Sequence, residues 1–240
     1  MTSYFISDLH LDDSRPAVTQ AFYRCLKNWA GNCDALYILG DFFEAWVGDD
    51  DDTKLAEDTK SALRAFSDSG SLLYIMHGNR DFLLGSEFCE ASGATLLSDP
   101  TRINLFGTPT LLMHGDSLCT DDHDYMTFRE QARSDAWQQQ LLSQPLAARK
   151  ALARQLREQS SSMNALKASD IMDVNDKAVE NALNAANCQR IIHGHTHRPK
   201  VHQFKLESDN AERWVLGDWC EKGWFIKASP RKLSLENFPI

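Results

Sequence analysis

Short apolar runs that end in a polar turn recur along the chain and predict the strands of a sheet. Such runs, rich in branched and aromatic residues and closed by Gly or a polar residue, are typical of buried strands. They lie at 3–6, 35–39, 71–76, 110–113 and 190–192, with closing strands at 214–219, 225–228 and 233–238. Apolar positions at helical spacing predict helices over 16–29, 55–66, 87–92 and 171–186. Because helices lie between several of the strands, we expect a layered α/β fold.

The region from about 120 to 168 interrupts this alternation. It has few strand-forming residues and much Gln, Ala, Arg, Leu and Ser, so we expect helices inserted into one domain that spans 1–240. The stretch 146–157 carries four basic residues, namely Arg149, Lys150, Arg154 and Arg157. A basic amphipathic helix on an acidic protein indicates either an anionic surface or ligand, or a solvated helix face.

Composition narrows the possible partners and the compartment. The net charge is −9, which argues against nucleic acid as a partner because such binding depends mainly on neutralising phosphates. The six cysteines form no C-x-x-C pair, so we expect the reduced thiols of a cytoplasmic protein. There is no signal peptide and no apolar run of membrane-spanning length, so any contact with a membrane is expected from its surface.

Polar side chains follow five of the predicted strands, at the point where each strand ends. They are Asp8, His10, Asp41, Asn79, His114, His195 and His197. In extended chain, residues two apart point the same way, so Asp8 can face the same side as His10, and His195 the same side as His197. Ligands of open α/β sheets gather at the carboxyl ends of strands, so we expect these donors at one rim. The His-rich turn at 193–197, taken alone, could also be a solvated loop.

Seven oxygen and nitrogen donors exceed the needs of one four-coordinate ion and suit two ions with a shared ligand. Asp41 is the natural bridge, because one carboxylate offers two oxygens. The mixture of carboxylate, amide and imidazole without cysteine fits Mn, Fe, Co or Zn, and its oxygen share favours Mn. Two metals about 3.5–4 Å apart can activate water and clamp phosphoryl oxygens, which predicts hydrolysis of a phosphate ester or anhydride. Asp218 and His193 are left outside this set, His193 as a structural residue.

The order of the motifs resembles the calcineurin-like metallophosphoesterase superfamily. The matching stretches are Asp8-Leu-His10, Gly40-Asp41, Gly78-Asn-Arg-Asp81, His114-Gly-Asp116 and His193-Gly-His-Thr-His197. The resemblance implies a four-layer fold of two packed mixed sheets flanked by helices, with an inserted helical lid. It also implies one metal held by Asp8, His10, Asp41 and His197, and a second metal held by Asp41, Asn79, His114 and His195.

Arg80 is a departure from many superfamily members, which have His after the motif Asn. An arginine cannot serve as a general acid at neutral pH, but it can neutralise phosphate charge with two hydrogen bonds. That suits a leaving group which is itself a phosphate and departs without a proton. The departure therefore favours a pyrophosphate substrate over a simple monoester.

The whole chain resembles the pyrophosphatases of lipid A biosynthesis within this superfamily. The stretches that carry this resemblance are 36–41, 44–50, 77–85, 113–116, 118–122, 171–175 and 193–199. It implies two Mn²⁺ ions and a UDP-linked diacyl sugar, with water attack on the α-phosphorus to release UMP and a diacylglucosamine 1-phosphate. The residues it assigns to catalysis are Asp41, Asn79, Arg80 and His195. Those it assigns to the substrate are Asn79, Arg80, Asp122, Ser160, Asn164, Lys167 and His195.

A diacyl substrate needs an apolar groove, which a helical lid can cover. We expect Trp46, Phe82, Phe128 and Leu141 to line it, although each could equally be ordinary core. The basic face of 146–157 would hold the lid against the cytoplasmic face of the inner membrane, and we expect a monomer that associates with it peripherally. A broad phosphodiesterase or nucleotide phosphatase is the alternative enzyme. A binding scaffold without activity is disfavoured, because no ligand is missing.

Overall fold

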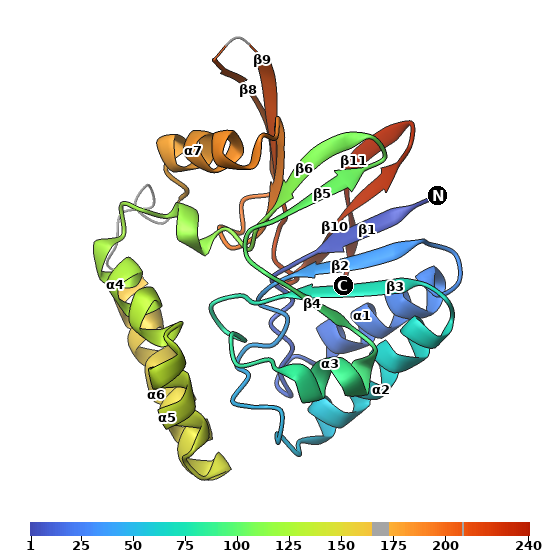
Figure 1. The fold of residues 1–240 in the computed structure, drawn as a ribbon. Coiled ribbons are helices and arrows are strands. Elements are labelled where there is room, and N and C mark those ends of the chain that lie inside the picture. The colour runs from blue at the N-terminus through green and yellow to red at the C-terminus, as the bar shows by residue number, and fades with distance from the viewer. Residues whose placement is uncertain (165–172, 208) are drawn as a thin grey trace.

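Two mixed sheets face each other in the structure (Figure 1). This computed structural model describes residues 1–164, 173–207 and 209–240, and the side chains of 158–164 are outside the description. The first sheet has the order β11-β10-β1-β2-β3-β4, with strands Lys232–Pro239, Lys222–Ser229, Ser3–Ile6, Ala35–Leu39, Leu72–Met76 and Thr95–Leu97. The second has the order β5-β6-β7-β9-β8, with strands Thr101–Leu105, Thr108–Leu112, Arg190–His193, Asp209–Val215 and Lys200–Leu206.

Parallel pairing brings the predicted polar turns to one rim. In the first sheet β1, β2 and β3 run parallel, with Ile6 beside Ile38 and Leu39 beside Met76. In the second sheet β6 and β7 run parallel, with Leu112 beside Ile192. The turns that follow these five strands therefore emerge on the same side of their sheets.

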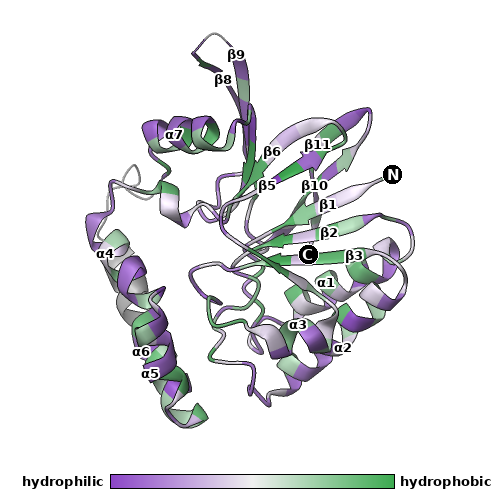
Figure 2. Cartoon of the chain, in the orientation of Figure 1, coloured by the Kyte–Doolittle hydropathy of each residue, from purple (hydrophilic) through white to green (hydrophobic). Residues whose placement is uncertain are grey.

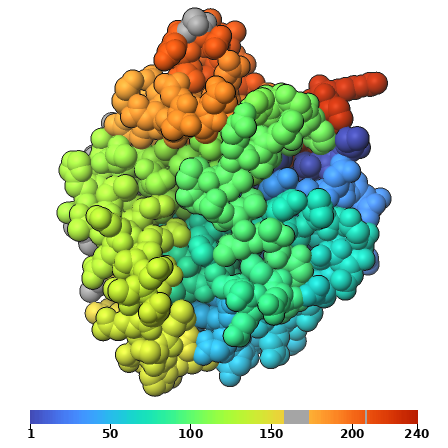
Figure 3. All heavy atoms as spheres, in the orientation of Figure 1, coloured from blue at the N-terminus to red at the C-terminus, as the bar shows by residue number. Residues whose placement is uncertain are grey.

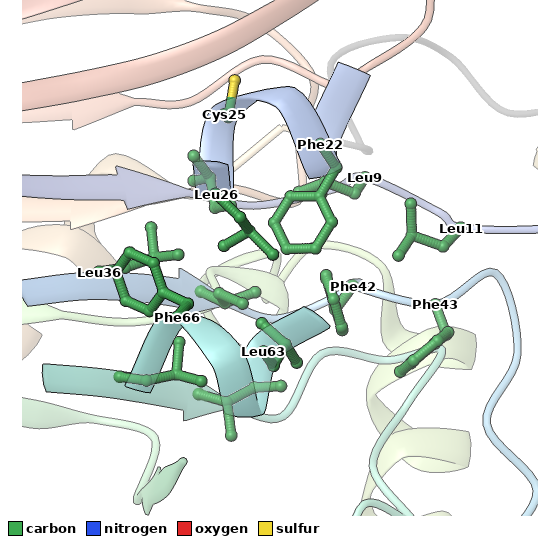
Figure 4. Close-up of a cluster of buried hydrophobic side chains, with 14 of the residues drawn as sticks. Leu9, Leu11, Phe22, Cys25, Leu26, Leu36, Phe42, Phe43, Leu63 and Phe66 are labelled. Carbon is green, nitrogen blue, oxygen red and sulfur yellow. The ribbon is translucent and has the colours of Figure 1, made fainter. Parts of the chain in front are cut away.

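Apolar clusters separate the layers. Helices α1 (Pro16–Trp29), α2 (Lys54–Asp68) and α3 (Ser86–Ser92) cover the outer face of the first sheet, where Phe22, Leu36 and Leu63 belong to one buried cluster (Figures 1 and 4). A second cluster between the sheets includes Phe5 and Trp214. The third lies under α7 (Asp176–Ala186) on the second sheet. The order helix, sheet, sheet, helix confirms the predicted four-layer fold.

Local signals explain where the helices begin. Pro16 opens α1, and Thr53 accepts a hydrogen bond from the backbone N–H of Ala56 at the start of α2. Asn175 does the same for α7, whose first residue is Asp176. The predicted start of this helix at 171 was therefore wrong for 173–175, and residues 171 and 172 lie outside the described part of the chain.

Three further helices follow β6 and the short turn after it. They are α4 (His123–Ala132), α5 (Asp135–Leu142) and α6 (Leu146–Asn164), called the helical segment below. Its yellow-green atoms lie against the blue and cyan atoms of the body of the protein (Figure 3), and its helices carry mixed polar and apolar residues (Figure 2). Among the described residues, no helix is both long and apolar enough to cross a membrane.

Several strands were not predicted. β4 has three residues, and β8 mixes polar with apolar positions at the edge of its sheet, so neither forms an apolar run. β5 was missed for the same reason, since its residues alternate between half-buried and exposed. The closing strand predicted at 214–219 ends earlier, because β9 stops at Val215 and Gly217 lies against the Trp224 ring.

Candidate two-metal active site

The turns at the rim have a strained backbone. Asp8, His10, Asp41, His195 and His197 all adopt positive φ angles between 49° and 68°. This left-handed conformation is uncommon for residues other than Gly and persists only where the surroundings enforce it. All five are among the seven predicted ligands, so the strain coincides with the candidate site.

Asp8, His10 and His197 form the first cluster, with ligand atoms within 4.8 Å of one another. Nε2 of His197 lies 3.4 Å from Oδ1 of Asp8 and 3.4 Å from Nε2 of His10. The carboxylate of Asp8 is fully buried and accepts hydrogen bonds from the backbone N–H of His195, at 3.1 and 3.0 Å.

Asp41, His114 and His195 form the second cluster, also within 4.8 Å. Asn79 completes it, because its side-chain oxygen lies 3.0 Å from Nε2 of His114 and 2.9 Å from Nδ1 of His195. On the other side of the ring, Nδ1 of His114 lies 2.9 Å from the carbonyl oxygen of Leu39, which fixes the imidazole with Nε2 toward the cluster.

The carboxylate of Asp41 lies between the two clusters. Oδ2 is 3.9 Å from Nε2 of His10, and Oδ1 is 3.7 Å from Nε2 of His114. Oδ1 also accepts a hydrogen bond of 2.8 Å from the backbone N–H of Arg80. The geometry is that of a shared ligand, with one oxygen toward each cluster.

Asp81 ties together the two turns that carry Asp41 and Asn79. Its fully buried carboxylate accepts hydrogen bonds from the backbone N–H groups of Phe42 and Gly78, both at 2.7 Å. Gly78 must lack a side chain, since a Cβ there would lie 2.1 Å from the backbone nitrogen of Asp41. The motif Gly-Asn-Arg-Asp therefore sets the distance between two candidate ligands.

The donors fit divalent metal ions in type. Burial opposes the charged form of His114, but the carboxylates of Asp41, Asp116 and Asp8 outweigh it and raise the pKa of His114 to about 9. Burial, with the positive charge of His114 added, lowers the pKa of His195 to about 3, so its imidazole is neutral at physiological pH. Burial also lowers the pKa of His193 to about 4. Nδ1–H of His193 donates a hydrogen bond of 2.9 Å to the carbonyl oxygen of Gly194, and Nε2 has no hydrogen-bond partner among the described atoms. His193 is in neither cluster. A neutral imidazole is the form that binds transition metals.

A cavity of about 270 Å³ lies beside the clusters, between the body of the protein and the helical segment. Asn79 and Arg80 line one end of it. Trp46, Phe82, Phe128 and Leu141, the four residues expected from the sequence, all line it, together with Tyr125, Trp137, Leu152 and Leu156. An apolar chamber therefore opens directly onto two of the predicted site residues.

The remaining predicted substrate contacts are only partly described. Asp122 caps α4 by accepting a hydrogen bond of 3.1 Å from the backbone N–H of Tyr125. Lys167 and the side chains of Ser160 and Asn164 lie outside the described residues. Asp218 is in neither cluster, but its charge helps to raise the pKa of His197.

The basic residues of α6 do not form the free cationic face that was predicted. Arg149 donates to both carboxylate oxygens of Asp50 and to the carbonyl oxygen of Val47, and Lys150 lies 2.8 Å from Asp51. Arg157 pairs with Glu44 at 2.8 Å. The acidic run 49–52 is accordingly the docking loop of α6. Two of its carboxylates, Asp50 and Asp51, are in direct contact with basic residues of α6.

Some residues at the site were not predicted from the sequence. Glu44 lies 3.1 Å from Nδ1 of His10. Tyr125 donates a hydrogen bond of 2.6 Å to the buried Asp116, and its ring centre lies 6.0 Å from that of His195, with the two planes inclined by 29°. Glu44 follows the predicted ligand Asp41 by three residues, and this nearness in the sequence could have indicated it as a site residue. Tyr125 reaches the site only because α4 packs there, which no local sequence pattern shows.

Two candidate metal-binding clusters lie at the strand ends of two facing sheets, with the carboxylate of Asp41 between them, which is the arrangement of a metallophosphoesterase. Residues 1–199 match the model of the calcineurin-like phosphoesterase family, and the chain belongs to this family. Solved structures agree on the fold. An archaeal phosphodiesterase matches with a TM-score of 0.52 and 12% identity, covering 100% of both chains. Vps29 from Entamoeba histolytica matches with a TM-score of 0.51 and 12% identity, covering 100% of this chain and 99% of its own.

Full-length relatives give a closer likeness. The chain is 51% identical over 240 residues to UDP-2,3-diacylglucosamine hydrolase of Cellvibrio japonicus, covering 100% of both chains. It is 52% identical over 241 residues to the protein of the same name in Marinobacter nauticus, covering 100% of this chain and 99% of the relative. The resemblance to the pyrophosphatases of lipid A biosynthesis, predicted from the motifs, is confirmed.

Proposed function

We propose that this chain hydrolyses the pyrophosphate bond of UDP-2,3-diacylglucosamine to UMP and 2,3-diacylglucosamine 1-phosphate. The observation that carries the proposal is the position of Asn79 and Arg80, which line an apolar cavity and also adjoin the two ligand clusters. A substrate with a charged diphosphate and apolar chains needs both environments side by side. The names of the full-length relatives support the same substrate.

Asp8, His10, Asp41 and His197 would hold one metal ion, and Asp41, Asn79, His114 and His195 would hold the other. The share of oxygen donors favours Mn²⁺ for both. When bound, two such ions lower the pKa of water and neutralise phosphoryl oxygens. The protein supplies the fixed spacing of the ligands, through Asp81 and the backbone of the two turns.

Arg80 is the residue proposed to receive the leaving phosphate. Its side chain lines the cavity beside Asn79, and a guanidinium can bind a phosphate through two hydrogen bonds. Water attacks the α-phosphorus and loses one proton to solvent, the bond from that phosphorus to the bridging oxygen breaks, and the oxygen leaves with the sugar phosphate. That phosphate needs no proton to depart. Asn79, His195 and Asp122 are proposed to orient the substrate, as are Ser160, Asn164 and Lys167.

The helical segment is proposed to act as a lid at about 120–168 that covers the acyl chains. Trp46, Phe82 and Phe128 contribute aromatic surface to the cavity, and burial of each methylene of a chain contributes about 0.8 kcal/mol. This gives the apolar cavity a role that a broad phosphodiesterase would not require.

We also propose peripheral attachment of a monomer to the cytoplasmic face of the inner membrane, through the helical segment. Ion pairs occupy three of the four basic residues of α6, so the support comes from exposed groups. Leu142, at the end of α5, is 43% exposed, and Arg154 on α6 is exposed as well. Flotation with vesicles that contain anionic lipid should weaken in Leu142→Glu with Arg154→Glu. Unchanged flotation would contradict the attachment.

A comparison of substrates tests the proposed activity. The purified chain with Mn²⁺ should turn over UDP-2,3-diacylglucosamine, with kcat/KM at least a hundredfold above that for bis(p-nitrophenyl) phosphate. Equal or greater turnover of the aryl diester would favour the broad phosphodiesterase. UDP-glucosamine without acyl chains serves as the matched control, because it keeps the diphosphate and lacks the groups that the cavity would hold.

A further inference from the structure

Glu44 lies between a histidine of the first cluster and the helical segment. Its Oε2 is 3.1 Å from Nδ1 of His10, and its Oε1 is 2.8 Å from Nε of Arg157 on α6. The side chain of Glu44 is 13% exposed and that of His10 is 9% exposed. One largely buried carboxylate thus contacts an imidazole with one oxygen and a guanidinium with the other.

The backbone fixes Glu44 in this position. The segments around His10 and Asp41 run side by side, because the N–H of His10 donates to the carbonyl of Asp41 at 3.0 Å. The N–H of Leu11 donates to Phe42, and the N–H of Glu44 donates back to Leu11 at 3.1 Å. Glu44 therefore reaches His10 from a rigid pair of extended segments rather than from a free loop.

The two nitrogens of the His10 ring face different groups. Nε2 lies 3.4 Å from Nε2 of His197 and 3.9 Å from Oδ2 of Asp41, so it points into the first cluster. Nδ1 lies on the other side of the ring, 3.1 Å from Oε2 of Glu44, at an angle that does not complete a hydrogen bond, and no other described atom partners it. A carboxylate at one ring nitrogen keeps the proton there and leaves the lone pair of the other nitrogen for a metal.

We propose that Glu44 is a positioning residue that holds His10 in its metal-binding tautomer and couples it to α6 through Arg157. The inference rests on the proposed two-metal function. When Arg157 holds the Glu44 carboxylate in place, His10 is kept with Nε2 toward the first cluster. In turn, metal binding at His10 stabilises the position of α6 in which Arg157 contacts Glu44. Because such coupling is reciprocal, each event strengthens the other by the same factor. Closure of the helical segment over the cavity and completion of the first cluster are then one linked event.

Titration of Mn²⁺ followed by electron paramagnetic resonance tests the positioning role without any turnover. Wild-type protein should bind two ions, and Glu44→Gln should bind one of them about 10- to 100-fold more weakly, the range for loss of a partner behind a metal-binding histidine. Asp50→Asn is the matched control, since it removes an ion pair to α6 that does not reach His10. Its Mn²⁺ affinity should fall by much less than that of Glu44→Gln, because it acts on His10 only through the seating of α6.

Hydrogen exchange over 146–157 tests the coupling. Saturating Mn²⁺ should slow exchange in the wild type and in Asp50→Asn, but not in Arg157→Gln. Arg157→Gln keeps Glu44, so it also tests the coupling if Glu44→Gln does not fold. The inference is overturned if Glu44→Gln binds both ions with wild-type affinity, or if Mn²⁺ protects α6 equally in Arg157→Gln. Failure of the wild type itself to bind Mn²⁺ would overturn the proposed function along with it.

Discussion

The guanidinium of Arg149 on α6 forms a two-armed ion pair with the carboxylate of Asp50, with Nη1 2.7 Å from Oδ1. The two residues are 99 positions apart in the chain. Arg149 is 4% exposed, and the same nitrogen also donates to the carbonyl oxygen of Val47. Gly48 makes room for this contact, since a Cβ there would lie 2.3 Å from Nη1 of Arg149. The pair fastens the helical segment to the rim of the cavity.

Arg149→Met should loosen α6 while it keeps most of the apolar stem. The substitution removes the hydrogen bonds from Arg149 to the Asp50 carboxylate. Because Asp50 is more than half exposed, these bonds contribute only about 1–2 kcal/mol to the stability of the docked helix. Hydrogen exchange over 146–157 should become faster, and KM for the diacyl substrate should rise more than kcat falls. Arg154→Met, on an exposed position of the same helix, is the control and should change neither quantity. Wild-type exchange in Arg149→Met would contradict a fastening role.

Asp41→Ala should remove the carboxylate that is proposed to serve both clusters. We expect kcat to fall by several orders of magnitude, with loss of tight binding of both Mn²⁺ ions, because each cluster loses an oxygen donor. Isothermal titration with Mn²⁺ and a turnover assay at saturating metal check this. Asp218→Ala, which removes a nearby carboxylate outside both clusters, should bind two ions. Near-normal turnover by Asp41→Ala would contradict the shared ligand.

Arg80→Ala should impair a phosphate leaving group more than an activated aryl leaving group. The guanidinium is proposed to neutralise the departing phosphate, whereas nitrophenolate leaves without such help. We expect a loss in kcat/KM at least tenfold larger for UDP-2,3-diacylglucosamine than for bis(p-nitrophenyl) phosphate. Arg102→Ala is the matched control, since it removes a strand arginine that does not line the cavity. An equal loss of kcat/KM on both substrates in Arg80→Ala would contradict the proposed role of Arg80 at the leaving phosphate.

Asp99→Asn should stabilise the protein above neutral pH. Burial raises the pKa of Asp99 from its ordinary 3.8 to about 6, and the charge of Asp116 adds to the rise. A raised folded-state pKa contributes stability that is complete below pH about 3.8 and is lost as pH rises through about 6. Two pKa units correspond to about 3 kcal/mol at most. Urea unfolding of both proteins at pH 4 and pH 8 measures this, and an equal difference at both pH values would contradict it.

The strand ends could be predicted from the sequence because their signals are local. Each apolar run stops at a Gly or a polar turn, and parallel pairing then brings Asp8, Asp41 and His114 to one rim. The four residues expected in the groove line the cavity, and two of them, Trp46 and Phe82, follow motif residues closely in the chain.

The links across the cavity could not be predicted in this way. The basic residues of α6 face the docking loop 49–52, and this pairing depends on how the helical segment folds back. The sequence shows both charge patterns but not that they meet. The same holds for Glu44, whose oxygens contact His10 and Arg157 from different elements. Long-range ion pairs are set by tertiary packing, which a local pattern does not contain.

The most direct test of the proposed hydrolysis is turnover of UDP-2,3-diacylglucosamine with Mn²⁺ in water enriched in oxygen-18. Mass spectrometry of the two products locates the label. Attack on the α-phosphorus predicts one labelled oxygen in UMP and none in 2,3-diacylglucosamine 1-phosphate. Label in the sugar phosphate, or no turnover of this substrate, would contradict the account.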